Sequence, residues 1–282
     1  MFAWRSSLLT LFSAVILAST TPATSVTASE LPHRCDDRDT DLHLTRSPDV
    51  KGEIDPALGA AIELERTWNH ERRVAIQDAL VWAGHYSGRL NGDLSGPTRL
   101  AIRRFQAEIG SQVTGYLSSD DLEILNFQHD TAKEAAGFRM VDEADLGIRV
   151  GLPLALIRRS TVAGHFINYE PLDQAAGTGL MLIAMEGTRA DLRTQKIVLT
   201  ASELVGDAPL ILTHRDWFVI AGTYGQFRSF SLLRLENGVM RGFMLTWTVE
   251  ADDQFRHVAT AILNSFRAIG GQTIDPAQRA SR

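Results

Sequence analysis

The spacing of apolar residues is helical between residues 69 and 127, in three runs that glycine-containing turns separate. The inward positions of the three runs are Ile76, Leu80 and Ala83; then Thr98, Ile102, Phe105 and Ile109; and finally Leu122 and Leu125. Gly84 stops the first run and Gly110 the second. We expect three short helices that form a small bundle.

The residues between these runs favour the same arrangement. Asn91-Gly92 is a strong turn dipeptide, and Ser95 can cap the second helix with Pro97 in its first turn. Ser118 and Asp121 have the spacing of a capping box for the third helix. Residues 128–136 are polar, and we expect them to form a linker.

Beyond the expected linker, apolar and polar residues alternate, which is typical of strands. The strands we expect are Gly137–Val141, Leu146–Leu154, Phe166–Tyr169, Gly179–Glu186, Leu210–His214, Trp217–Gly222 and Gln226–Glu236, with a helix over Arg189–Leu204. Asn237-Gly238 predicts a two-residue hairpin turn, followed by a strand with Phe243, Leu245, Trp247 and Val249 on one face.

A final helix is indicated by an apolar stripe that follows Asp252-Asp253, two residues that suit the first turn of a helix. The stripe consists of Phe255, Val258, Ala259, Ile262 and Phe266. We therefore predict an α+β protein: a three-helix bundle at 69–127 and an antiparallel-sheet α+β sandwich at 137–270. The order of elements in the second part is similar to that of PsbP-like domains, an analogy of fold alone.

The two ends of the chain differ from this central region. Arg5 precedes an apolar run from Leu8 to Ala18, and Val26-Thr27-Ala28 offers a small-residue cleavage site. This layout predicts a secretory signal at 1–28, since the apolar run is shorter than the ~20 residues of a membrane span. Residues 29–68 are expected to be a polar lead-in and 271–282 a disordered tail.

Charge and cysteine content narrow the function classes. The formal net charge of −6 argues against nucleic-acid binding, which needs a basic surface. Cys35 is the single cysteine, so an intramolecular disulfide cannot form. Arg34 beside it is unlike the small residue that precedes an acylated lipoprotein cysteine, and the polar surroundings of Cys35 do not favour a catalytic thiol.

Residues 73–125 resemble the peptidoglycan-binding domain that is appended to bacterial cell-wall hydrolases. The resemblance is carried by Gln77, Leu80, Gly84-His85-Tyr86, Gly88, Asn91-Gly92, Leu94, Thr98, Ala101-Ile102, Phe105-Gln106, Thr114-Gly115 and Leu117. Asn91 stands where the family has Asp, and Ser95 where Gly is common. The resemblance implies a helical bundle, peptidoglycan as partner and a place in the cell envelope, most simply the periplasm.

Enzymes of the cell wall leave recognisable motifs, and the sequence lacks most of them. No Ser-His-Gly-Cys motif and no HExxH or HxH pair is present, and Ser87 is misplaced for a nucleophile elbow. His214-Arg215-Asp216 reads as a solvated hairpin turn. A glycoside hydrolase needs two positioned carboxylates, which the spacing of residues leaves open. Glu186 follows an apolar strand, and the alternative interpretation is that it simply ends that strand. We assign no catalytic residue, metal or cofactor.

Candidate ligand-binding residues gather around the glycine turn and the second helix. Arg99 and Arg103 lie four apart on a face other than the apolar one, and their guanidinium groups suit the carboxylates of wall stem peptides. Tyr86, Asn91 and Asp93 would add an aromatic ring and hydrogen-bonding groups. The alternative is that the arginines are an ordinary solvated face and that Asn91 and Gln106 only hold the turn.

Three classes of function remain open. The first is an exported, non-catalytic peptidoglycan-binding protein, with no membrane span after signal cleavage, whose C-terminal domain binds another envelope protein or a ligand. The second is a wall-remodelling enzyme with an active site in the C-terminal domain. The third is a protein-interaction module that has lost glycan binding.

Overall fold

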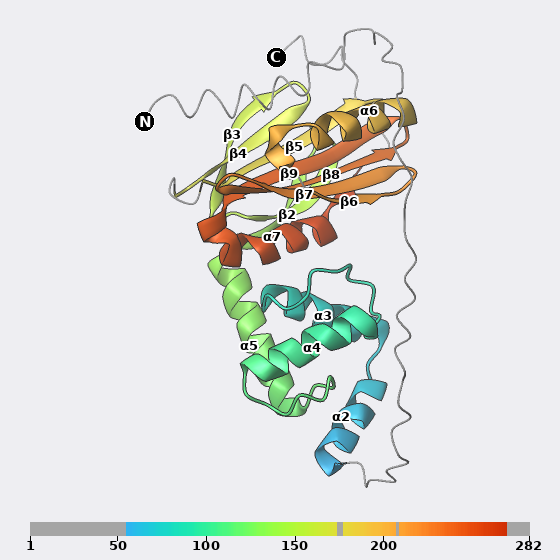
Figure 1. Cartoon of the computed structure of the whole chain (residues 1–282), viewed down its shortest axis with the longest axis vertical. Coiled ribbons are helices and arrows are strands. Elements are labelled where there is room, and N and C mark those ends of the chain that lie inside the picture. Colours follow the sequence, from blue (N-terminus) through green and yellow to red (C-terminus); the bar gives the residue numbers. More distant parts are fainter. Residues whose placement is uncertain (1–54, 174–176, 207–208, 270–282) are drawn as a thin grey trace, which may run out of the picture. The chain divides into compact units, whose positions relative to one another are not determined.

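The computed structural model describes residues 55–173, 177–206 and 209–269 (Figure 1). The predicted signal peptide, residues 29–54 of the predicted lead-in and the predicted tail at 271–282 lie outside these ranges. The α-helices are α2 (Pro56–Arg66), α3 (His70–Trp82), α4 (Gly96–Glu108), α5 (Ser119–Ala135), α6 (Arg189–Thr200) and α7 (Asp252–Ser265). Within the described ranges, no helix combines the length and the apolar content needed to cross a bilayer.

The three predicted helices of the bundle are confirmed as α3, α4 and α5. Their inward residues form one buried cluster, in which Leu80, Ile102, Phe105 and Leu125 are fully withdrawn from solvent. The capping box of α5 is present, since Ser118 and Asp121 each bond to the other's backbone N–H. Ser95 is the N-cap of α4, but its side chain makes no capping hydrogen bond.

Most of the segment that we expected to be a polar linker, residues 128–136, is helical, because α5 continues through it to Ala135. Two polar side chains in this half of α5 reach back to α3: His129 Nε2 lies 3.2 Å and Lys133 Nζ 3.1 Å from Asp78 Oδ2. His129 and Lys133 therefore hold α5 against α3, whereas Asp130, Thr131 and Glu134 form its exposed face.

The predicted lead-in at 29–68 also needs correction at its end. Pro56–Arg66 forms α2, in which Ala61 is buried. Trp68 follows it and belongs to the core of the bundle, with Leu64 packed against the same cluster. Only three of the eleven residues of α2 are charged, and the sequence analysis did not separate this short segment from the polar stretch that precedes it.

The strands of the second part are β1 (Phe138–Glu143), β2 (Ile148–Pro153), β3 (Ile157–Ala163), β4 (Phe166–Pro171), β5 (Gly179–Glu186), β6 (Leu210–Thr213), β7 (Trp217–Tyr224), β8 (Phe227–Glu236), β9 (Val239–Thr248) and β10 (Arg267–Ala268). In the described residues they form a seven-stranded sheet, in the order β3-β4-β5-β9-β8-β7-β6, and a three-stranded sheet, β1-β2-β10. Every pairing is antiparallel, so the predicted α+β class is confirmed.

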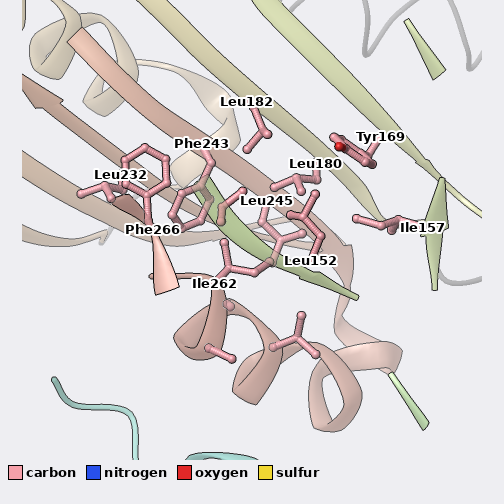
Figure 2. Packing of buried hydrophobic residues seen from close by; sticks show 14 of the residues in the cluster. Leu152, Ile157, Tyr169, Leu180, Leu182, Leu232, Phe243, Leu245, Ile262 and Phe266 are labelled. Atoms are coloured by element: carbon pink, nitrogen blue, oxygen red, sulfur yellow. The ribbon is translucent and has the colours of Figure 1, made fainter. Parts of the chain in front are cut away.

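Strand β9 is the centre of the large sheet, and all of its residues are buried. Phe243 lies on one face, with its ring 5.9 Å from that of Phe266, on the side where α7 and β2 pack. Met240 lies on the other face, beside Gly187 and the first turn of α6. Helices α6 and α7 thus cover opposite faces of the sheet (Figure 1), and Figure 2 shows the apolar side chains between the sheet and α7.

At the predicted hairpin turn the structure agrees with the prediction, and at β3, Val249 and Phe266 it differs. Asn237 and Gly238 both have positive φ, 51° and 75°, as a two-residue hairpin turn requires. The sequence reading missed β3, because β3 is exposed along most of its length and shows no apolar alternation. Val249 leaves the predicted strand for a short 3₁₀ turn, and Phe266 is buried just after α7 ends.

Trp82, the last residue of α3, packs within the core of the second part. Its ring centroid lies 5.0 Å from that of Phe138 in β1 and 5.3 Å from that of His257 in α7. In α7, the side chain of Asn264 accepts a hydrogen bond from Leu90 N–H and donates one to Gly88 C=O, at 3.1 Å each. The glycine turn after α3 is therefore bonded directly to α7.

We expect Phe266→Ala to lower the free energy of unfolding by about 3–5 kcal/mol, because the ring is buried between α7 and the sheet and its removal leaves a cavity. Urea denaturation followed by circular dichroism measures the change. Phe127→Ala is the control, since Phe127 is 71% exposed on α5. Equal losses in the two variants would contradict the buried position of Phe266.

The contact of His129 with α3 should depend on pH. The hydrogen bond to Asp78, with a further one to Asp130, raises the pKa of His129 above 6.5 despite partial burial. The stabilisation is then complete below pH 6.5 and is lost as the pH rises through the raised pKa. We expect His129→Ala to lower the melting temperature more at pH 5.5 than at pH 8.5. A loss that grows toward alkaline pH would refute this assignment.

Candidate functional site

The turn after α3 is built around Gln77, whose side chain is fully buried. Its Oε1 accepts hydrogen bonds from the N–H groups of Asn91 and Gly92, at 2.9 and 2.8 Å. Its Nε2 donates to the Asp93 carbonyl at 2.9 Å and to Thr98 Oγ1 at 3.1 Å. One side-chain amide thus fixes the whole glycine turn and the start of α4.

The turn after α4 is built in the same way around Gln106, which is 1% exposed. Its Oε1 accepts from the N–H groups of Thr114 and Gly115, at 3.0 and 2.8 Å. Its Nε2 donates to the Tyr116 carbonyl at 2.8 Å and to Asp121 Oδ2 at 3.0 Å. Gln106 therefore joins the second turn to the capping box of α5.

The two turns share a sequence pattern that explains their likeness. Residues 91–95 read NGDLS and residues 114–118 read TGYLS, each after a helix that carries the buried glutamine. Gly92 and Gly115 both have positive φ, 72° and 83°, in the region that favours glycine. A Cβ at Gly92 would lie 2.7 Å from His70 Nδ1, so a larger side chain at this position would also clash with His70.

Three of the predicted site residues belong to the first turn. The Tyr86 hydroxyl donates to the Arg89 carbonyl at 2.9 Å, and Asn91 Oδ1 accepts from Gln77 Nε2 at 3.1 Å and from Asp93 N–H at 3.0 Å. Asp93 is exposed, and the hydrogen bond from Ser95 N–H lowers the pKa of its carboxyl. Tyr86 and Asn91 shape the turn, whereas Asp93 presents an anion to solvent.

Arg99, in the first turn of α4, lies against the second turn and already has several partners. Its guanidinium pairs with the Glu65 carboxylate through two hydrogen bonds and donates to the Gly115 carbonyl at 2.7 Å. Its Cζ also lies 4.0 Å from the centre of the Tyr116 ring, a cation–π contact. Arg99 thus connects α2, α4 and the second turn.

Arg103 lies one helical turn further along α4 and is exposed. Its side chain runs over the second turn, since a Cβ built on Gly115 would lie 3.0 Å from Arg103 Nε. Within the described part of the chain, no carboxylate forms an ion pair with it. Arg103 is therefore a cation that is available to a ligand, next to the Arg99–Tyr116 stack.

The predicted site thus divides into two groups. Tyr86, Asn91 and Asp93 belong to the Gln77 turn, and the two arginines belong to the Gln106 turn. The reading of the sequence did not identify Glu65 and Tyr116 as partners of Arg99. Among the described residues, His, Cys, Asp and Glu side chains do not form a group of three that could hold a metal ion.

Comparison with known proteins bears on the bundle. Residues 69–125 match the family model described as "Putative peptidoglycan binding domain". The matched range contains both buried glutamines, both glycine turns and all five candidate residues. It confirms the resemblance inferred from the sequence and supports binding to the cell wall. No curated protein matches the chain.

Solved structures with similar backbones were also found. The solution structure of cyanobacterial PsbP from Synechocystis sp. PCC 6803 has a TM-score of 0.34 and 16% identity, covering 46% of this chain and 92% of that one. A mutant of the protein Mog1 has a TM-score of 0.33 and 8% identity, covering 48% of this chain and 97% of that one.

Replacing Gln77 by Leu should release the first turn and leave the second intact. The N–H groups of Asn91 and Gly92 lose their acceptor, at a cost of about 1–3 kcal/mol for each group left unsatisfied. Amide hydrogen exchange by NMR should show faster exchange at Gly92 and unchanged exchange at Gly115. Gln254→Leu, an exposed position on α7, is the control, and a Gly92 amide that stays protected would argue against the role of Gln77.

Proposed function

We propose that the chain is an exported, non-catalytic protein that binds peptidoglycan through its helical bundle. The observation that carries the proposal is the match of residues 69–125 to peptidoglycan-binding domains, combined with the available cation Arg103 in that segment. The short apolar run near the N-terminus, with its small-residue cleavage site, supports export. The cell envelope, most simply the periplasm, is then the place where the protein acts.

The second turn is the part of the bundle best suited to a wall peptide. Stem peptides carry carboxylates, and a guanidinium donates charge-assisted hydrogen bonds to them. Because Glu65 occupies Arg99, we assign the ligand carboxylate to Arg103, with Arg99 holding Tyr116 and Gly115 in position. Arg99 is in this proposal a positioning residue.

The first turn supplies the polar remainder of the proposed site. Asp93 is ionised and exposed, so it can accept hydrogen bonds from sugar hydroxyls or from an amino group of the stem peptide. Tyr86 and Asn91 keep the backbone of this turn in place through Gln77 and Arg89. The C-terminal α+β part, which starts at about residue 137, is proposed to bind another envelope protein or a ligand.

Pelleting with purified sacculi tests the proposal. We expect the wild-type protein to pellet without releasing muropeptides, and to pellet less as the salt concentration rises. Arg103→Ala should weaken binding by about tenfold or more, the loss of one charge-assisted hydrogen bond. Arg104→Ala is the matched control, because Arg104 is the adjacent exposed arginine of α4 and the net charge changes equally.

Each outcome has a distinct meaning. Release of muropeptides would identify a wall-remodelling enzyme, and a wild-type protein that stays in solution would identify a protein-interaction module. If the two arginine variants bind alike, with melting temperatures equal to that of the wild type, the site at the second turn is wrong.

A further inference from the structure

The two edges of the large sheet differ in how they meet solvent. Strand β3 forms one edge and β6 the other, and in the described part of the chain no further strand pairs with either (Figure 1). An edge strand presents unpaired N–H and C=O groups that another strand can use. Native sheets protect such edges with charges, bulges or proline, and only one edge of this sheet has them along its length.

Strand β3 is a protected edge. It carries Arg158 and Arg159, and its pairing with β4 is interrupted by a register shift between Arg159 and Thr161. Arg159 also forms an ion pair with Glu143 at 2.9 Å. Charge and irregular backbone together oppose the addition of another strand here.

Strand β6 has the opposite character. Its sequence LILT contains no charge, and its pairing with β7 is regular throughout. Leu210, Ile211 and Leu212 are 59%, 38% and 49% exposed. Leu212 lies opposite Val219, a member of the core cluster, so the apolar face of the sheet continues from the core to this edge.

The pairing with β7 determines which backbone groups of β6 face outward. His214 N–H bonds to the Trp217 carbonyl at 2.8 Å, so His214, Leu212 and Leu210 direct their backbone groups to β7. Ile211 and Thr213 alternate with them, and their N–H and C=O groups point away from the sheet. These outward groups are the ones that an added strand would meet.

We propose that β6 pairs with β6 of a second copy of this chain, antiparallel and about a two-fold axis at Ile211. In that register Ile211 bonds to its own counterpart, and Leu210 lies opposite Leu212 of the second copy on the same face. Thr213 N–H of one copy donates to the Pro209 carbonyl of the other copy. Because Pro209 has no N–H to donate in return, the ladder of hydrogen bonds ends there. The two large sheets become one continuous sheet.

A second copy is the occupant because the strand complements itself in this register. An axis at Leu212 would instead place Ile211 opposite Thr213 and Leu210 opposite His214, which buries fewer apolar pairs. A two-fold antiparallel contact also uses the same surface on both copies, as in most homodimers. A dimer would carry two bundles, so it would bind a polymeric wall with higher avidity than a monomer.

Sedimentation equilibrium of the purified full chain over a concentration series tests the dimer. We expect Ile211→Pro to abolish it, because proline removes the outward N–H and leaves the bonds to β7 in place. Val162→Lys is the control: Val162 is 50% exposed on the other edge strand, and this variant should remain dimeric. Melting temperatures identify any variant that is misfolded.

A crosslink tests the register even if Ile211→Pro does not fold. In a Cys35→Ser background, Ile211→Cys should form a disulfide-linked dimer on mild oxidation, since facing Cα atoms in such a pair lie about 5.5 Å apart. Val162→Cys, in the same background, should run as a monomer on non-reducing gels. A monomeric wild type, a folded Ile211→Pro dimer or equal crosslinking at both positions would overturn the proposal, without bearing on sacculus binding.

Discussion

The bundle depends on the requirement that a buried amide satisfy both its oxygen and its nitrogen. Gln77 and Gln106 meet this requirement through the backbone of the turn that follows each helix. In each turn the amide oxygen accepts from two successive N–H groups, and the second of these residues is a glycine with positive φ. The conformation of both turns is therefore fixed by two buried side chains.

In the second part of the chain, the structure depends on strand β9, which has no exposed face. Because β9 is buried on both sides, the sheet needs a cover on each, and α6 and α7 provide these covers with the small sheet beside α7. Trp82 extends the covering layer from α3, packing on Phe138 and His257. The turn that carries Asn91 and Asp93 is consequently held close to α7 by Asn264.

Periodicity was sufficient to predict the bundle helices, most of the strands and the α+β class, because these elements bury one clear face. Prediction from apolar spacing failed for elements whose buried residues do not recur at a helical or strand period. Strand β3 is exposed, and the C-terminal end of α5 is polar, so neither has the expected apolar pattern. Helix α2 is short, and Ala61 is its one buried residue, so it too lacks a clear apolar stripe. The candidate site shows the same limit: the spacing of Arg99 and Arg103 indicated a pair, but nothing in the spacing could show that Glu65, 34 positions away, pairs with one of them.

The contact between Glu65 and Arg99 crosses the boundary of the segment that is defined by similarity to other proteins. The segment that resembles other proteins begins at residue 69, yet the guanidinium within it is neutralised by a carboxylate from the preceding helix. If residues 69–125 were transplanted into another polypeptide, Arg99 would arrive with one surface against Tyr116 and no anion beside it. A segment that keeps Arg99 paired with Glu65 must therefore include α2, which lies before the matched residues 69–125.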